Sequence, residues 1–371
     1  MWVLIEQKFF AGPDARSLLF LEVFGLARDG RHTLLTKPLF GAGDDRLIEI
    51  WLAELPGPVA EEVRLVLNQG VSDATKLLAD AVGITLTDAS QSDWKQARIQ
   101  LCDAVRLLRM PLGLLLENRR ADLHFLLALA PPTQRQQLQS ALEKGWVEVL
   151  HGGGLEEMQA LIEELQVNVS PNINRLARLL RLWVMFDRDS DRHDRTQCSS
   201  ASLRLQELCA GVSMPEGYCW SLSYYQLGRR TIENYLPEPL LRQWQLAAYG
   251  GEKTKRRQAV NALCELRKIR PLAAHQLNMK RGLYGDLDVI AQKAIRDSGR
   301  DIQDHELDQL FQGLPKWVRK ALSQGFGKDV ARFFAQEHPG FEEAFRSEFD
   351  RHRKHSEPSR QVILDSLFAR L

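Results

Sequence analysis

Residues 182–189, Leu-Trp-Val-Met-Phe-Asp-Arg-Asp, are the stretch on which the fold interpretation rests. Five apolar residues in a row, with no alternation of polar and apolar positions, are typical of a strand buried on both faces. Such strands occur in parallel sheets that are covered by helices on each side. Asp187 and Asp189 come directly after the run, so we expect them at the carboxyl end of the strand. In an open parallel sheet, that end lines the functional crevice.

The same rhythm of strand, loop and helix continues on both sides of this stretch. Short apolar runs predict further strands at residues 112–116, 146–150 and 219–224. Helical periodicity between them predicts helices near residues 123–130, 155–165 and 203–209. Strands that alternate with helices favour βαβ units. We therefore predict an α/β domain over residues 111–240, with a parallel sheet flanked by helices.

The two flanking regions have different patterns. Residues 1–110 combine two predicted strands with three predicted helices, which indicates an N-terminal α+β domain that serves as a partner-docking surface or scaffold. The strands are expected at residues 2–5 and 17–23, and the helices at 45–55, 60–67 and 92–108. Residues 241–371 are mostly helical in pattern, and we predict a helical C-terminal region that completes the functional unit.

The composition is that of an ordinary globular protein. Of the 371 residues, 44% are hydrophobic and 26% are charged, which excludes collagen-like, mucin-like and disordered classes. Five cysteines with no Cys-x-x-Cys pair indicate neither a disulfide framework nor a zinc knuckle. The start lacks the order of a signal peptide, and no run approaches the ~18 apolar residues of a membrane span. We therefore expect a cytoplasmic protein with no membrane partner.

The formal net charge of +1 conceals an uneven distribution. Residues 1–175 hold 17 Lys and Arg against 23 Asp and Glu, whereas residues 176–371 hold 32 against 25. Residues 251–281 alone carry nine cations and two anions. This segment is either a solvated helix face or a track for the phosphate backbone of a nucleic acid. For the second interpretation, the candidate nucleic-acid-binding residues are Lys253, Lys255, Arg256, Arg257 and Arg281.

Acidic residues directly follow two of the predicted strands. Glu117 follows the first strand of the α/β domain, and Asp187 and Asp189 follow the stretch quoted above. Because the carboxyl ends of parallel strands share one edge of a sheet, these side chains can meet in space. Carboxylate oxygens suit Mg²⁺ or Mn²⁺. The tripeptide Asp-x-Asp alone is a weak signal, since residues 286–288 form another, and the alternative is that residues 187–195 are a solvated loop.

Three longer motifs add a family resemblance. They are Arg230-Thr231-Ile232-Glu233-Asn234-Tyr235-Leu236, Lys280-Arg281-Gly282-Leu283 and Gly325-Phe326-Gly327-Lys328. Together with Glu117, a glycine-rich turn and Asp-x-Asp after successive strands, they resemble the TOPRIM nucleases of the overcoming-lysogenization-defect (OLD) family. They also resemble the related nuclease subunits of phage-defence systems. The resemblance spans residues 111–335 and leaves the first hundred residues unexplained.

The resemblance implies a TOPRIM-like sheet with a metal centre. The expected ligands of one or two Mg²⁺ or Mn²⁺ ions are Glu117, Asp187, Asp189 and Glu233. Lys280 would stabilise the charge that develops on the cleaved phosphate.

Asp122 departs from the family pattern. The family has a glycine directly after the first glutamate and an aspartate four residues after it, whereas here Asn118 replaces the glycine and Asp122 is five residues on. Five residues turn a helix by about 140° from the metal-facing direction. Asp122 is therefore a candidate metal ligand that the spacing disfavours.

The leading prediction is a divalent-metal-dependent endonuclease of DNA or structured RNA, an effector of prokaryotic anti-phage defence. The alternative is a TOPRIM-derived regulatory subunit that binds nucleic acid without cutting it, which the departure at Asn118 and Asp122 favours. A topoisomerase- or primase-like enzyme is disfavoured, because the chain is short and lacks the additional catalytic domains. No Walker A sequence is present, so an ATPase would be a separate partner subunit. A homodimer is a further expectation.

Overall fold

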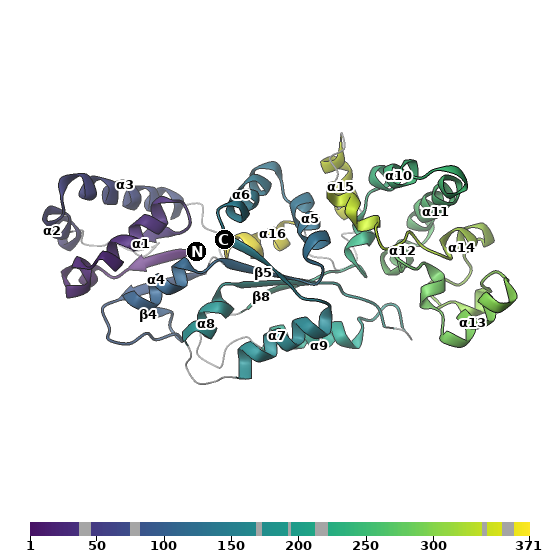
Figure 1. Ribbon diagram of the computed structural model, residues 1–371, viewed down its shortest axis with the longest axis horizontal. Coiled ribbons are helices and arrows are strands. Elements are labelled where there is room, and N and C mark those ends of the chain that lie inside the picture. Colours follow the sequence, from purple (N-terminus) through teal and green to yellow (C-terminus); the bar gives the residue numbers. More distant parts are fainter. Residues whose placement is uncertain are drawn as a thin grey trace.

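The computed structural model has an α/β architecture with two four-stranded parallel sheets (Figure 1). It describes residues 1–36, 46–74, 82–167, 173–191, 194–211, 222–335, 340–350 and 360–371. The sheet of the first hundred residues lies at one end of the long axis, the second sheet lies in the middle, and C-terminal helices lie at the other end. The α/β class predicted from the sequence is confirmed.

The central sheet has the strand order β6-β5-β7-β8, and every neighbouring pair is parallel. Its strands are β5 (Leu112–Leu116), β6 (Val147–His151), β7 (Leu182–Phe186) and β8 (Ser223–Gln226). The ranges of β5 and β7 are those predicted, and β6 is shifted by one residue. Of the fourth predicted strand, residues 219–221 lie outside the described ranges. The prediction of a parallel sheet in this region is confirmed.

Side chains of the central strands alternate between two layers of helices. Leu114 and Leu116 belong to one hydrophobic cluster, and Val184 and Phe186 belong to another. The covering helices are α5 (Arg119–Leu129) and α6 (Pro132–Glu143) on one face, and α7 (Leu155–Val167), α8 (Ile173–Leu180) and α9 (Ser200–Gly211) on the other. A strand covered on both faces needs apolar residues at every position, which explains the unbroken apolar run of β7.

The N-terminal sheet is also parallel throughout, with the order β2-β1-β3-β4. Its strands are β1 (Trp2–Ile5), β2 (Thr33–Leu35), β3 (Gly83–Thr87) and β4 (Arg98–Gln100). Its helices are α1 (Leu18–Arg28), α2 (Arg46–Glu54), α3 (Gly57–Ala74) and α4 (Leu101–Arg109), with the short turns η1 (Gln7–Ala11) and η2 (Pro13–Arg16). Parallel strands joined by helices form an α/β unit, so the prediction of an α+β domain is wrong.

Two segments of this region differ from their predicted structure. Residues 17–23, expected as a strand, begin α1, because Ser17 caps the helix by accepting the N–H of Phe20 and buried residues recur at helical spacing. Residues 92–108, expected as one helix, contain β4 before α4 begins. A three-residue strand is too short to display alternation. Asp45, the predicted start of α2, lies outside the described residues.

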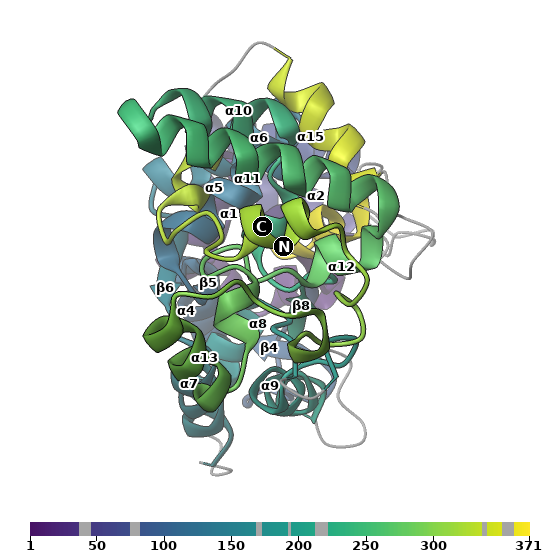
Figure 2. The ribbon, with the colours of Figure 1, turned by 90° about the vertical axis from the view of Figure 1, so that its right-hand side faces the viewer.

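The described part of the C-terminal region is mostly helical, as predicted. Its elements are η3 (Ile232–Tyr235), α10 (Glu238–Leu246), α11 (Gly250–Ile269), α12 (Pro271–Gln276), η4 (Leu283–Asp286), α13 (Val289–Ser298), η5 (Asp304–Glu306), α14 (Lys316–Leu322), η6 (Val330–Ala335), α15 (Phe341–Asp350) and α16 (Arg360–Phe368). Figure 2 looks at this end of the molecule, with α10, α11 and α12 towards the viewer. The last helix returns to the central sheet, where the indole N–H of Trp183 donates to Ser366 Oγ at 3.0 Å.

The two sheets share part of their core. One hydrophobic cluster contains Trp51 and Ile84 of the N-terminal region together with Met158 and Val184 of the central region. The proposed boundaries at residues 110 and 240 therefore stay predictions. Within the described ranges, no helix is long and apolar enough to cross a membrane.

Candidate functional site

A small acidic cavity lies at the carboxyl ends of β5, β6 and β7. Its volume is about 280 Å³. Four carboxylic acids and one lysine that the sequence singled out line it: Glu117, Asp122, Asp187, Glu233 and Lys280. The rest of the lining is Asn118, Ala121, His151, Gly153, Gly154 and Ile232. Glu117 and Asp187 reach one cavity although they are 70 positions apart in sequence, because parallel strands direct their following loops to one edge of the sheet.

Glu117 and Asp187 are neighbours because β5 and β7 are neighbours. Leu116 pairs with Met185 in the sheet register, which places the next residues of both strands side by side. The backbone N–H of Asp187 donates to Glu117 Oε2 at 3.4 Å. Both carboxylates therefore project from the centre of the sheet, and the solvated-loop interpretation does not hold for Asp187.

Asp122 reaches the same cavity despite its unusual spacing. Asn118 is the N-cap of α5, and its side chain accepts the N–H of Ala121. Asp122 Oδ2 in turn accepts the N–H of Asn118 at 2.8 Å. Glu117 precedes the cap, so the angular count along the helix does not begin at Glu117. The chain before the cap is not helical, so the turn of about 140° expected for five helical residues does not apply between Glu117 and Asp122.

Asp189 lies beside the cavity rather than in its lining. Its φ is +45°, a left-handed conformation that costs energy for a residue with a side chain, and its N–H donates to the carbonyl of Arg230 at 2.9 Å. Arg230 is held in turn by Asp286, whose Oδ2 lies 2.8 Å from Arg230 Nη1. A network of buried groups therefore fixes the turn that follows β7.

Glu233 and Lys280 form the wall opposite the strands. Glu233 is 2% exposed on η3, a turn fixed by a reciprocal pair of bonds between Thr231 and Asn234. Its Oε1 lies 3.4 Å from Lys280 Nζ. Its Oε2 is buried and has no hydrogen-bond partner among the described residues. Tyr235 of the same turn is fully buried against Phe349, which fits core packing rather than a nucleophile.

Burial, together with the charges of the neighbouring carboxylates, raises the pKa values of three of the cavity's carboxyl groups. Burial raises the pKa of Glu117 to about 7, with a further contribution from the charge of Asp189. Burial likewise raises the pKa of Asp122 to about 7, against the N–H of Asn118 that lowers it. Burial and then the charge of Glu117 raise the pKa of Asp187 well above its ordinary value. A cluster of this kind gains free energy when a cation offsets its charge.

Lys280 places one positively charged side chain among these carboxyl groups. Burial opposes its charge, but Glu233, Asp187 and Glu117 outweigh that effect and raise its pKa. Its side chain is still 42% exposed, so the ammonium group faces solvent as well as the carboxylates.

The donor set fits a hard divalent cation. In the described ranges, no group of three or more His, Cys, Asp or Glu side chains is arranged closely enough to hold a metal ion as it stands. The cavity nevertheless offers carboxylate oxygens, which Mg²⁺ and Mn²⁺ prefer. The unpartnered Oε2 of buried Glu233 is one oxygen that a cation would satisfy. Glu117, Asp122, Asp187 and Glu233 are the residues that would hold it.

Two of the sequence motifs meet directly and carry Lys280. The N–H of Phe326 donates to the carbonyl of Met279 at 2.7 Å, and that of Gly327 to the carbonyl of Lys280 at 3.2 Å. Gly282 and Gly325 lie back to back, since a Cβ on Gly282 would be 2.3 Å from the Gly325 nitrogen. The segments 280–283 and 325–328 thus form one unit that positions Lys280.

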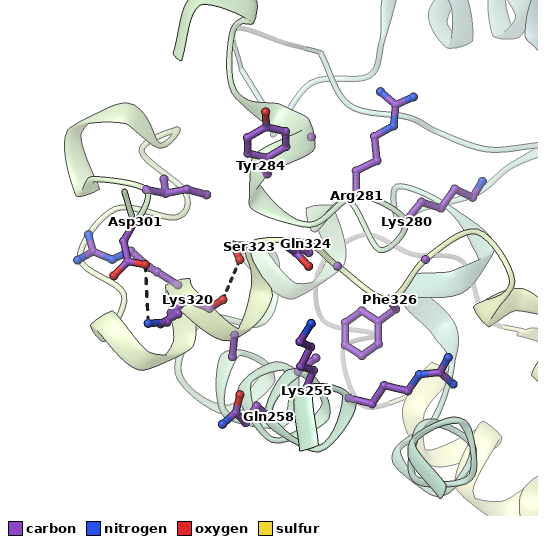
Figure 3. Close-up of a pocket in the computed structure, with 18 of the residues that line it drawn as sticks. Lys255, Gln258, Lys280, Arg281, Tyr284, Asp301, Lys320, Ser323, Gln324 and Phe326 are labelled. Carbon is purple, nitrogen blue, oxygen red and sulfur yellow. Dashed lines mark hydrogen bonds and ion pairs between the residues drawn. The ribbon is translucent and has the colours of Figure 1, made fainter. Parts of the chain in front are cut away.

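A large basic groove adjoins the acidic cavity, and Lys280 lines both. The groove has a volume of about 1410 Å³ (Figure 3). Of the predicted nucleic-acid-binding residues, Lys255, Arg256 and Arg281 line it, whereas Lys253 and Arg257 do not. Helix α11 also has an apolar side in the core, so part of residues 251–281 is a solvated helix face and part faces the groove.

Some residues that line the cavity and the groove are not among the predicted site residues. His151 is exposed on the cavity rim, so it is not a buried structural histidine. The far side of the groove carries Lys316, Lys320 and Lys328. Lys316 and Lys320 lie four residues apart on α14, and Lys328 ends the motif at residues 325–328, but the basic segment predicted to bind nucleic acid, residues 251–281, includes none of the three. His193 of the loop after β7 lies outside the described residues.

Fold and site together define an α/β chain with an acidic cavity at the strand ends and a basic groove beside it. No family model, no curated protein and no solved structure matches the chain. Its function is therefore inferred from its own residues.

Proposed function

We propose that this chain is a divalent-metal-dependent nuclease of the TOPRIM type, which hydrolyses phosphodiester bonds of DNA or RNA. The observation that carries the proposal is the junction at Lys280, which lines both a cavity of carboxylates and a groove of cations. Carboxylates suit a hard divalent cation, and cations suit a phosphate backbone. A nucleic acid held in the groove would therefore present a phosphate to the cavity.

The acidic residues and the lysine of this site each have a role in the proposal. Glu117, Asp122, Asp187 and Glu233 hold the metal, and Asp189 beside the cavity adds to the negative field around it. The Mg²⁺ or Mn²⁺ ion, when bound, supplies Lewis-acid polarisation of the phosphate and a more acidic water. Lys280 offers its ammonium group to the phosphate and offsets the negative charge that develops during cleavage.

The convergence of the motifs supports the TOPRIM type in particular. Glu117 and Asp187 come from two strands, Glu233 from the Ile-Glu-Asn-Tyr turn, and Lys280 from a fourth segment, yet all line one cavity. Motifs scattered over more than 160 residues would not meet by accident. This is the arrangement that a resemblance to OLD-type nucleases leads one to expect.

The biological setting follows from the same resemblance. We propose a cytoplasmic effector of prokaryotic anti-phage defence that works with a separate ATPase subunit and as a homodimer. Residues 1–110 are the proposed docking surface for the ATPase. Leu18, Ile50 and Leu65 of its helices are exposed by 84%, 52% and 69%, which suits a protein partner.

The decisive experiment compares Asp187→Asn with the wild type. Plasmid DNA and tRNA are incubated with Mg²⁺ or Mn²⁺, and cleavage is followed on gels. Loss of one negative ligand should reduce cleavage by about 100-fold or more. The matched control is Asp288→Asn, which alters the chain's other Asp-x-Asp. Asp288 caps α13 by accepting the N–H of Ala291, and asparagine caps helices equally well.

The outcomes separate the two candidate functions. Metal-dependent cleavage that Asp187→Asn abolishes and Asp288→Asn retains supports the nuclease. Nucleic-acid binding without cleavage in the wild type favours the non-cleaving regulatory subunit. Equal cleavage by Asp187→Asn and the wild type rules out the proposed centre. Circular dichroism of each variant confirms that it is folded.

A further inference from the structure

The basic groove has a strong excess of positive charge. Eleven Lys and Arg residues line it, against three Asp and Glu residues. They come from α11, from the Lys280 segment and from residues 296–332. Figure 3 shows Lys280 and Arg281 on one side of the groove, Lys320 on the other, and Lys255 between them. A single surface helix cannot explain charges that face one another across a groove.

The cations of the far wall are available to a ligand. Lys316 and Lys328 are exposed and have no acidic partner among the described residues. Lys320 is 72% exposed and lies 4.0 Å from Asp301, which is the limit of an ion pair. Arg300 and Arg319, by contrast, pair with Glu306 and Asp304 at 2.5 Å. Three lysines of this wall therefore keep their charge for a partner.

Two of the three aromatic residues that line the groove are buried and not available for stacking. Trp244 and Phe326 are 5% and 4% exposed, and the guanidinium of Arg256 covers the Trp244 ring at 4.4 Å. Tyr284 donates its hydroxyl proton to the carbonyl of Gln292. Proteins that bind single strands stack bases on exposed aromatic rings, whereas duplexes present phosphates outward and keep their bases stacked. The groove therefore suits a duplex.

We propose that Lys316, Lys320 and Lys328 form a phosphate-binding wall that holds the backbone of a double-stranded nucleic acid beside the cavity. The wall contacts phosphates and not bases, so it binds without regard to sequence. The inference rests on the proposed function for what happens at the cavity, but the binding itself needs no cleavage. DNA and RNA duplexes share this chemistry, and the experiment distinguishes them.

The experiment measures binding in the Asp187→Asn background without metal, so that cleavage plays no part. Fluorescence anisotropy gives the Kd for a short DNA duplex, the matching RNA duplex and the single strand, each at several salt concentrations. The wall variant carries Lys316→Gln, Lys320→Gln and Lys328→Gln. The control carries Lys268→Gln, Lys293→Gln and Arg204→Gln, which remove the same charge from exposed residues outside the groove.

Loss of three phosphate contacts should lower the slope of log Kd against log salt by about 3 and weaken binding alike for different sequences. The control should keep the slope of the parent. The tighter of the two duplexes identifies the natural ligand. The inference is overturned if the wall variant binds as the parent does, if the control loses as much as the wall variant, or if the single strand binds more tightly than both duplexes.

Failure of the proposed function would look different. If the wild type never cleaves while the wall variant loses duplex binding, the wall is retained and the nuclease is discarded. If the wild type cleaves while the wall variant binds normally, the nuclease is retained and the wall is discarded.

Discussion

At the scale of single residues, the cavity brings buried carboxyl groups close together, an arrangement that lowers the stability of the fold. Glu117, Asp122 and Asp187 are carboxyl groups withdrawn from water close to one another, and both burial and like charge oppose their ionisation. Lys280 relieves only part of this cost, since it is paired with Glu233. A divalent cation would offset the remaining negative charge. Loss of one carboxylate should therefore raise the free energy of unfolding without metal and reduce the stabilisation that metal binding provides.

Glu117→Gln tests this crossover. At pH 8 without metal, we expect the variant to have a higher free energy of unfolding than the wild type, by roughly 1–3 kcal/mol, because a buried charge is removed. Saturating Mn²⁺ should stabilise the wild type, by about 2.7 kcal/mol at a concentration of 100 Kd, and the variant much less. Urea unfolding with and without Mn²⁺ measures both effects.

The control for this prediction is Glu148→Gln. Glu148 is an exposed residue of β6 that does not line the cavity, so its substitution should leave both the metal-free stability and the response to Mn²⁺ unchanged. An identical response to Mn²⁺ in the Glu117→Gln variant and the wild type would remove Glu117 from the metal-binding residues.

At the scale of elements, the position of Lys280 depends on two segments that touch through glycine. A Cβ on Gly282 would lie 2.1 Å from the carbonyl oxygen of Leu322, and its φ of +64° already disfavours other residues. No side chain can be inserted unless the backbone of residues 322–325 moves away. The position of the Lys280 side chain in the cavity therefore depends on how the C-terminal region packs at this contact.

Gly282→Ala and Gly299→Ala separate conformational strain from close approach. Gly299 has nearly the same φ, +65°, but a Cβ on Gly299 would meet nothing within 4 Å. We expect Gly299→Ala to cost about 1 kcal/mol of unfolding free energy and Gly282→Ala about 3 kcal/mol or more. Urea unfolding measures the difference. Equal losses would show that the contact with Leu322 is unimportant.

The sequence predicted some elements correctly and others not, for physical reasons. The strands β5 and β7 are buried on both faces, so their apolar runs were unambiguous. Residues 17–23 are also rich in apolar residues, but the cap at Ser17 and the burial of residues at helical spacing make them the start of α1. The strand β4 has three residues, too few for any pattern.

The candidate site likewise contains residues that the sequence predicted and residues that it did not. Glu117, Asp187, Glu233 and Lys280 were predicted from strand ends and motifs, and they do line one cavity. The spacing along the sequence disfavoured Asp122, but the cap at Asn118 changes where the helical count begins. The groove wall was not predicted: Lys316 and Lys320 share one face of α14, but only the packing of α14 against residues 325–328 and α11 places them and Lys328 across a groove from the basic segment 251–281.

At the scale of the whole molecule, the near-zero net charge hides a spatial separation. Carboxylates gather at the strand ends of the central sheet, and cations gather in the groove beside it, with Lys280 between them. The N-terminal sheet shares one hydrophobic cluster with residues of the central sheet. Within the N-terminal region, His32 is 5% exposed beside β2, and its Nε2 lies 2.8 Å from the carbonyl oxygen of Leu108 in α4.

The protonation of His32 should make the stability of the whole fold depend on pH. Burial and nearby positive charges lower its pKa well below its ordinary value, so the folded state keeps the ring neutral, with Nε2 donating to Leu108. The unfolded chain takes up a proton near pH 6.5. The unfolded state then binds more protons than the folded state, so the free energy of unfolding should fall as the pH drops below about 6.5.

His32→Gln isolates this contribution, which is about 1.4 kcal/mol per pH unit below pH 6.5. Urea unfolding from pH 8 to pH 5 should show a smaller acid-induced loss in the variant than in the wild type, even though the variant is less stable at pH 8. His305→Gln, which alters an exposed histidine of η5, should keep the wild-type pH dependence. Three carboxyl groups of the cavity have raised pKa values, so they increase the free energy of unfolding as the pH falls. This contribution is the same in the wild type and in both variants. The difference between wild type and His32→Gln therefore reports the histidine alone, and parallel curves for the two would disprove its role.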